Sequence, residues 1–280
     1  MGIGSGTNNG QLITWDNNLG GYKWGPYYGA TTTPGQYLTW NGTALEWIMI
    51  PTRNTPIDAY TIAEWNFDEA IGSTSFTDSV GGQVLTNLES PNVKAGVPGI
   101  FGSSVMFTNA GGLIGAPLVE PNPISQTISY WWSSIIPQTQ QYILHKAAVA
   151  GDPWTAPYVA GMAGYVVNGV EIGWFVNVNG VYNNLSVSCS VPSGVWNLFT
   201  LTWDGTTLRM YLNGYERLSH VYGTGATPLG QGDHTGPWVI GALQTYRISG
   251  LIDKFRVEST VRSAEYIAKM YKDGIGLFEI

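Results

Sequence analysis

Hydrophobic and polar residues alternate over short segments along most of this chain, a pattern typical of β-strands with one buried face. The clearest example is Val195–Trp203, which Asp204-Gly205 separates from a second run, Leu208–Leu212. Asn213-Gly214 follows that second run. Because Asp-Gly and Asn-Gly adopt positive φ angles at low cost, the sequence predicts two tight hairpin turns here.

Strand-like alternation recurs throughout the chain after residue 60, and the spacing becomes helical near the end. The predicted strands are Thr61–Phe67, Ser103–Phe107, Ile124–Ser133, Tyr142–Lys146, Gly164–Val167, Glu171–Val178, Val181–Ser188, Val195–Trp203, Leu208–Leu212, Trp238–Ala242 and Gly250–Val257. A helix is predicted over Arg262–Tyr271, with Ser263 as its cap and Gly274 at its end. We therefore expect an all-β fold, a two-sheet antiparallel jelly-roll sandwich with one short C-terminal helix.

The first 51 residues contain an internal repeat. Gly10–Asp16 returns as Gly35–Asn41, and each copy is followed by a second tryptophan and a proline. Each unit predicts a strand, a turn and another strand. Isolated hairpins are marginally stable in water, so this small β-repeat module must pack against its own sandwich, against other copies or against a larger assembly.

Ordered motifs in the rest of the chain carry a resemblance to a known family. They are Trp65–Glu69, Asp78–Gly82, Gly96–Phe107, Trp196–Gly214, Gly250–Val257 and Arg262–Ile267. This order resembles laminin-G-like domains of the concanavalin A-like lectin group over about residues 60–276. The resemblance implies the jelly-roll fold, whereas function depends on the individual site. The short repeats Gly-Gln-Leu-Ile-Thr-Trp and Gly-Gln-Tyr-Leu-Thr-Trp resemble units of bacteriophage tail-fibre and head-decoration proteins.

Three parts are predicted: a β-repeat module for anchoring or oligomerisation over residues 1–51, a linker over 52–59 and the jelly roll over 60–280. The module carries little charge and four tryptophans, the composition of an interface core: Trp15, Trp24, Trp40 and Trp47. By analogy we expect a homotrimer that also contacts capsid or tail proteins. The alternative is an extension that only completes the monomer.

Composition narrows the classes of partner. Charged residues are 11% of the chain and its net charge is −7, which argues against binding the nucleic-acid backbone. No segment reaches the ~18 consecutive apolar residues of a membrane span. The start of the sequence lacks the features of a signal peptide, which favours a virion component made in the host cytoplasm. Cys189 is the single cysteine, so no intrachain disulfide can form.

Two long, aromatic, glycine-rich segments are candidates for carbohydrate binding, which needs exposed aromatic faces beside polar groups. Residues 147–164 contain Trp154 and Tyr158, and residues 220–238 contain Asp233, His234 and Trp238. Both segments exceed the length of a simple connection. The alternative is that their aromatic residues are buried against a neighbouring subunit.

The family resemblance also implies a structural Ca²⁺, because related sandwiches hold one where a glycine-rich loop meets the last strand. The matching residues are Asp78 and Asp253, but Val80 replaces the small or polar residue usual in the family. The alternative is that Asp78 organises a turn, and that Asp253 pairs with Arg256 or accepts backbone hydrogen bonds.

Two carboxylates on one face of a strand could catalyse glycoside hydrolysis. Glu64, Asn66 and Asp68 would share one face of a strand, but hydrolases of this fold use a Glu-x-Asp-x-x-Glu pattern that this sequence lacks. We therefore predict a bacteriophage virion surface protein without enzymatic activity, a capsid decoration, head fibre or short tail fibre that displays a lectin-like domain to host-surface glycans. The alternatives are a secreted-type bacterial glycan-binding adhesin and, third, a glycoside hydrolase.

Overall fold

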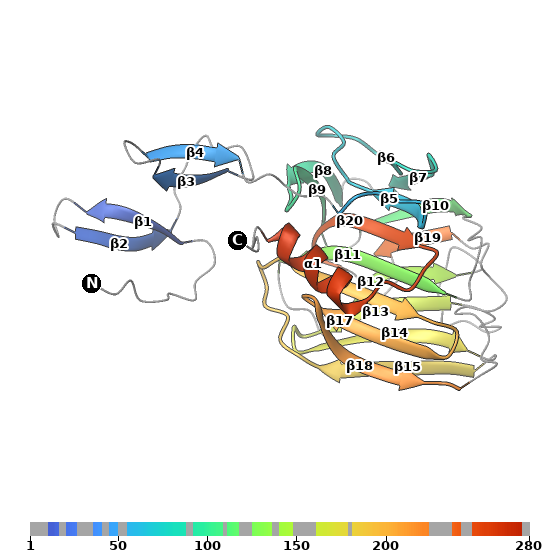
Figure 1. The fold of residues 1–280 in the computed structure, drawn as a ribbon. Coiled ribbons are helices and arrows are strands. Elements are labelled where there is room, and N and C mark those ends of the chain that lie inside the picture. The colour runs from blue at the N-terminus through green and yellow to red at the C-terminus, as the bar shows by residue number, and fades with distance from the viewer. Residues whose placement is uncertain are drawn as a thin grey trace.

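The computed structural model describes residues 55–87, 92–108, 111–117, 125–135, 140–147, 161–178, 181–223, 237–241 and 248–275, together with the backbone of four strands in the first 51 residues. Two antiparallel sheets of eight strands stack face to face (Figure 1). The predicted two-sheet sandwich is therefore confirmed.

Sheet I has the order β18-β17-β16-β11-β20-β9-β8, with β5 paired to β20, and sheet II has the order β15-β14-β13-β12-β19-β10-β7-β6. The strands of sheet I are β5 (Thr61–Trp65), β8 (Val93–Pro98), β9 (Ser103–Phe107), β11 (Gln126–Ser134), β16 (Asn197–Trp203), β17 (Thr207–Leu212), β18 (Tyr215–Val221) and β20 (Gly250–Glu258). Those of sheet II are β6 (Ser75–Thr77), β7 (Val84–Asn87), β10 (Gly112–Pro117), β12 (Gln141–Ala147), β13 (Gly161–Val167), β14 (Glu171–Val178), β15 (Val181–Ser188) and β19 (Pro237–Gly241). The late strands β19 and β20 lie inside the sheets, which gives the crossing connections of a jelly roll.

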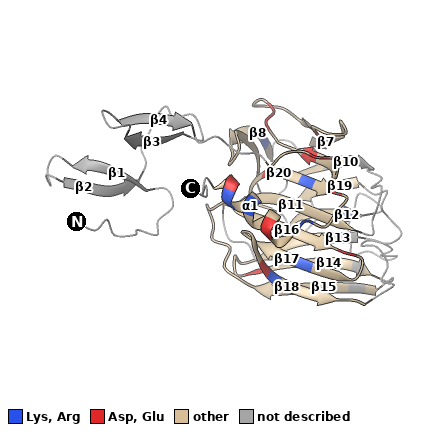
Figure 2. Ribbon diagram, viewed as in Figure 1, with Lys and Arg blue, Asp and Glu red and all other residues tan. Residues whose placement is uncertain are grey.

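The core between the sheets is built largely from aromatic side chains. Trp132 and Trp203 enter it from sheet I, and Trp174 and Trp238 enter it from sheet II. Phe255 of β20 meets the edge of the Trp238 ring at a centroid distance of 5.1 Å. Fully burying a large apolar side chain contributes about 2–3 kcal/mol. The charged residues are few, and both signs are interspersed along the strands (Figure 2).

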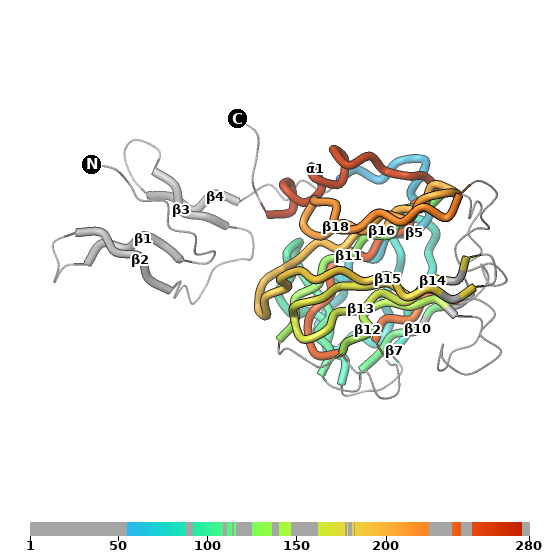
Figure 3. The backbone as a smooth tube through the Cα atoms, turned by 90° about the horizontal axis from the view of Figure 1, so that it is seen from below, coloured from blue at the N-terminus to red at the C-terminus, as the bar shows by residue number. Residues whose placement is uncertain are grey.

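The helix α1 (Ala264–Gly274) lies across the face of sheet I that points away from sheet II (Figure 3). The Ser263 side chain accepts a hydrogen bond from the Tyr266 N–H, so the predicted cap is confirmed. Met270 of the helix packs with Trp131 in a second, smaller core. A Cβ at Gly274 would lie 2.3 Å from the Trp131 ring, so only glycine permits this close approach.

The first 51 residues form two separate hairpins. β1 (Gln11–Asp16) pairs antiparallel with β2 (Gly21–Pro26), and β3 (Gln36–Trp40) pairs antiparallel with β4 (Leu45–Met49). The two predicted strands of each repeat are thus present, and the turns between them lie outside the described residues. The side chains of the four tryptophans, Trp15, Trp24, Trp40 and Trp47, lie outside the described part of the structure, so their place in an interface stays a prediction. In the described part of the chain, no helix is long and apolar enough to cross a bilayer.

Candidate functional site

The two segments predicted to bind carbohydrate begin and end at the same end of the sandwich. Ala147, the last residue of β12, pairs with Gly161, the first residue of β13, so residues 148–160 leave and return at one point. Lys146 pairs with Trp238, so residues 224–236 rejoin sheet II beside that point. We call this end of the sandwich, where β12 and β18 finish and β13 and β19 begin, the loop end. The residues between these positions, including Trp154, Tyr158, Asp233 and His234, lie outside the described residues.

Three aromatic rings mark the part of the loop end that belongs to sheet I, and we call them the aromatic step: Trp203, His220 and Tyr222. The Tyr222 ring lies edge-on to Trp203 at a centroid distance of 5.7 Å and to His220 at 4.5 Å. Trp203 is buried, Tyr222 is half-buried and His220 is exposed. The step therefore rises from the core to the surface where residues 224–236 begin.

Burial controls the chemistry of Tyr222. Desolvation raises the pKa of its phenol to about 12, so the hydroxyl keeps its proton at neutral pH. This hydroxyl has no hydrogen-bond partner among the described residues. Buried hydroxyls normally have a partner. Because this oxygen is itself shielded from solvent, it is a buried polar atom of the aromatic step and not an accessible contact for a ligand.

The β16–β17 hairpin holds the aromatic step in place. The Asp204 carboxylate accepts hydrogen bonds from the N–H groups of Thr206 and Thr207 at 3.0 and 2.7 Å, and it pairs with Arg209 at 2.7 Å. Burial alone would raise the pKa of Asp204, but the bonds from Arg209, Thr206 and Thr207 outweigh it and lower the pKa to about 2. The Tyr222 N–H in turn donates to the Thr206 carbonyl.

Trp238 does not belong to the accessible surface of the loop end. Its side chain is 1% exposed, its ring packs on Phe255, and the Lys146 ammonium lies 5.1 Å from its ring centroid. A ring with no accessible face cannot stack on a sugar. The expectation that Trp238 contacts a glycan is therefore corrected: the residue lies within a buried strand, and its role is to pack the core.

Asp78 organises a turn. One carboxylate oxygen accepts from the N–H groups of Glu64 and Val80 at 2.7 and 2.9 Å, and the other accepts from Gly81 at 2.6 Å and Gln83 at 3.4 Å. The side chain thus fastens the 78–83 loop to β5. These contacts agree with the alternative that Asp78 stabilises a turn.

Asp253 is buried on the outer face of β20. Its Oδ2 atom accepts from the N–H groups of Ile100 and Phe101, each at 2.9 Å, while Oδ1 has no partner among the described residues. Burial raises the pKa of this carboxyl well above its usual value. The described residues contain no group of three or more His, Cys, Asp or Glu side chains that could hold a metal ion. Calcium binding stays a prediction.

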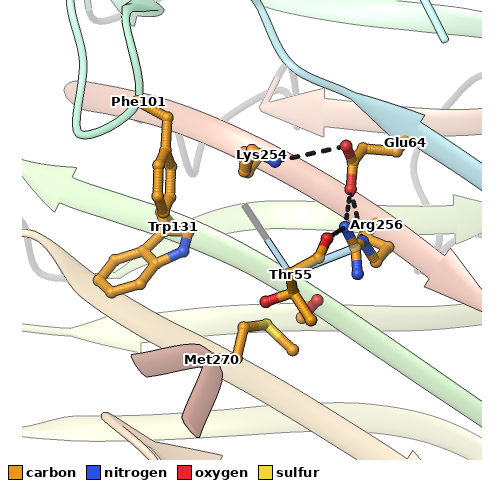
Figure 4. A pocket seen from close by; sticks show the side chains of 8 residues that line it. Thr55, Glu64, Phe101, Trp131, Lys254, Arg256 and Met270 are labelled. Atoms are coloured by element: carbon orange, nitrogen blue, oxygen red, sulfur yellow. Dashed lines mark hydrogen bonds and ion pairs between the residues drawn. The ribbon is translucent and has the colours of Figure 1, made fainter. Parts of the chain in front are cut away.

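Glu64 is part of a buried ionic cluster rather than an open carboxylate (Figure 4). It is 1% exposed, its Oε1 lies 3.3 Å from the Lys254 ammonium, and its Oε2 pairs with the Arg256 guanidinium. The adjoining cavity has a volume of about 10 Å³, the space of about one water molecule. A sugar cannot reach Glu64 here, so this carboxylate cannot act as an acid or base on a glycan.

The same face of sheet I binds the segment that leads into the sandwich. Arg256 donates to the Thr55 carbonyl at 2.6 Å. Arg262 pairs with Asp58 at 2.7 Å and with Glu258 at 2.6 Å. The end of the predicted linker is therefore fastened to β20 and to Arg262, which precedes α1. Sequence reasoning missed this network, although Asp253, Lys254, Arg256 and Glu258 stand out as charges in an otherwise apolar strand.

A separate groove of about 510 Å³ lies between the 71–74 turn and β8. Its polar side chains are Ser73, Thr74, Asn87 and Lys94, and none of the described residues that line it is aromatic. The volume falls in the range of small-molecule sites, but the groove lacks a ring for stacking on a sugar. The loop end is therefore the stronger candidate for a glycan site.

Comparison with known proteins agrees with this architecture. A family model described as the concanavalin A-like lectin/glucanases superfamily matches residues 116–268, more than half of the chain. The chain belongs to this superfamily. No curated protein matches it in sequence.

Solved structures show the same fold at low sequence identity. Domain 4 of AbnA, a GH43 extracellular arabinanase from Geobacillus stearothermophilus, solved in complex with arabinotriose, has a TM-score of 0.56 and 17% identity, covering 77% of this chain and 100% of that domain. The binding domain of botulinum neurotoxin serotype D has a TM-score of 0.56 and 17% identity, covering 76% of this chain. This chain spans 51% of that toxin domain. The superfamily member described here is thus a lectin-like jelly roll, in a fold that occurs in binding domains and beside hydrolases.

Proposed function

We propose that this protein is a non-enzymatic adhesin whose sandwich binds carbohydrate at the loop end. One observation carries the proposal: both long aromatic segments start and finish at the loop end, where the His220 ring of the aromatic step is exposed. An aromatic face beside free polar groups is the usual composition of a sugar subsite. The arabinotriose complex of the similar arabinanase domain supports this class of ligand.

The absence of catalysis is part of the proposal. Glu64 is the carboxylate that the sequence offered for hydrolysis. It forms ion pairs with Lys254 and Arg256, and the cavity beside it has no room for a substrate. Retaining hydrolysis requires two accessible carboxylates ~5 Å apart. We therefore expect bound glycans to remain intact.

The N-terminal hairpins serve, in this proposal, to anchor the sandwich on a bacteriophage particle, as a head decoration, head fibre or short tail fibre. Two observations support this role. The repeats resemble phage fibre units, and each repeat folds as a two-stranded sheet too small to be stable alone. Self-association as a trimer and contact with capsid or tail proteins remain proposals. A secreted bacterial adhesin is the alternative setting for the same binding domain.

The test is a glycan array probed with the full chain, followed by calorimetric titration of each positive glycan. His220→Ala should weaken binding by about tenfold, because it removes the exposed ring of the aromatic step. Ile71→Ala is the matched control, since Ile71 is an exposed apolar residue in the other groove. Absence of binding to every glycan, or a loss with Ile71→Ala alone, contradicts the proposed site.

A further inference from the structure

Both sheets end on the same side of the sandwich. β18 is the outermost strand of sheet I, β15 is the outermost strand of sheet II, and the two strands lie side by side (Figures 1 and 3). An edge strand leaves one row of backbone N–H and C=O groups free to pair with another chain. Natural edges are usually protected against such pairing by charges, proline or bulges.

The β18 edge has this protection. Its pairing with β17 shifts register between Met210 and Tyr211, which places a bulge in the strand. Glu216 and Arg217 stand at that bulge, and nearly every side chain of the strand is exposed. A bulged, charged strand is a poor template for another strand.

The β15 edge lacks each of these features. Its sequence, Val181–Ser188, contains no charged residue and no proline. It pairs with β14 over eight consecutive residues without a register shift. A regular, uncharged edge of this length exposes its backbone groups to any complementary strand, so the contrast with β18 singles out β15.

Apolar side chains reinforce the contrast. Leu185, Val187 and Cys189 pack against the core but are only partly buried, and Leu218 of β18 does the same from the opposite sheet. The core therefore reaches the surface along the line between the two edges. A partner strand on β15 would cover this apolar line as well as the free backbone groups.

We propose that β15 pairs antiparallel with β15 of a second copy of this chain, which joins sheet II of both copies into one continuous sheet. Residues directly opposite each other in an antiparallel pair share a face. On β15 the exposed Asn184, Ser186 and Ser188 alternate with the half-buried Leu185 and Val187. A twofold axis at Ser186 places Leu185 opposite Val187 of the second copy and Asn184 opposite Ser188.

This register is self-complementary. Apolar residues meet apolar residues on the core side, polar residues meet polar residues on the outer side, and no like charges oppose each other. The twofold axis also makes the contact isologous, so pairing stops at two copies per edge. The inference concerns the sandwich and does not depend on the carbohydrate site or on the N-terminal hairpins.

The test measures the mass of the full chain by sedimentation velocity over the micromolar range. Ser186→Lys places two ammonium groups opposite each other at the axis and should halve the assembly mass; Ser186→Glu should do the same. Mixing the two variants should restore the wild-type mass, because opposite charges then face each other. Ser75→Lys is the control, since Ser75 is an exposed residue on β6, the other edge strand of sheet II.

Three outcomes contradict the inference: equal masses for wild type and Ser186→Lys, an equal loss of mass with Ser75→Lys, or no recovery when the Lys and Glu variants are mixed. Circular dichroism of each variant verifies that it is folded. As a second measurement, Ser186→Cys in a Cys189→Ser chain should form a disulfide between copies under mild oxidation. A Ser186→Cys chain that stays reduced in the dimer rules out the proposed register. If β15 instead pairs with a different protein, no homodimer should form at all.

Discussion

Replacing Glu64 by Gln tests whether the ionic cluster of Glu64, Lys254 and Arg256 under α1 is shielded from solvent, as the structure indicates. Glu64 is the carboxylate that faces both Lys254 and Arg256, and all three side chains are buried. Gln keeps the size of the side chain but removes its charge. Lys254 and Arg256 then lose the carboxylate that they share, and Arg256 keeps the more distant Glu258 at 3.9 Å. Removing one partner of a buried ion pair costs ~3–5 kcal/mol, and the amide oxygen retains some hydrogen bonding, so we expect a loss of about 3 kcal/mol.

The loss can be measured by urea unfolding followed by tryptophan fluorescence, which reports on the aromatic core. For a domain of this size the corresponding decrease in Tm is about 6–12 °C. Lys269→Gln is the control, because Lys269 pairs with Asp273 on an exposed face of α1 and the pair should contribute at most about 0.5 kcal/mol.

A companion variant separates the cost of leaving the two cations without their shared carboxylate from the net contribution of the whole charged cluster. Changing Glu64, Lys254 and Arg256 together to Leu, Met and Met removes all three charges, so its cost should be far smaller than the sum of the single changes. The reasoning is refuted if Glu64→Gln lies within about 1 kcal/mol of wild type, since solvent must then reach the two cations.

Three further predictions concern other buried groups. Burial lowers the pKa of His145 to about 3, so on acidification the unfolded chain takes up a proton at this residue before the folded chain does. The free energy of unfolding should therefore fall by about 1.4 kcal/mol per pH unit from about pH 6.5 towards pH 3. Unfolding titrations of His145→Leu should show a smaller slope. Gly173→Ala should displace the Tyr165 ring, which a Cβ would approach to 2.2 Å, and a lower Tm with an altered near-ultraviolet circular dichroism spectrum would verify it. Asp78→Ala should lower the free energy of unfolding by about 2–3 kcal/mol, equally in calcium and in EDTA, because backbone N–H groups occupy its carboxylate; a loss seen only with calcium would instead reveal a metal site.

The sequence predicted the fold well where local chemistry and burial agree. The Asp204-Gly205 and Asn213-Gly214 turns are present, and β14 and β15 have the predicted bounds. Of the strands absent from the prediction, β6 and β18 have weak patterns. β6 has three residues, and β18 has almost no buried side chain, so neither shows the alternation that identifies a strand.

The candidate site was less predictable, because sequence does not tell which aromatic residues a loop exposes. Trp238 follows a long glycine-rich segment, yet it lies within strand β19 and points into the core. Lys254 has a φ of 47°, and this bulge in β20 brings its ammonium to Glu64, a residue far away in the sequence. The alternation of apolar and polar residues alone predicts neither the burial of Trp238 nor the contact between Lys254 and Glu64.

Carbohydrate binding at the loop end is the central claim, and hydrogen exchange tests it most directly. The full chain is measured with and without an oligosaccharide that scored on the array, and protected amides are located by mass spectrometry. We predict protection in residues 148–160 and 224–236 and around His220–Tyr222. Protection confined to the groove at Val93–Pro98, or none at a saturating ligand concentration, contradicts the account.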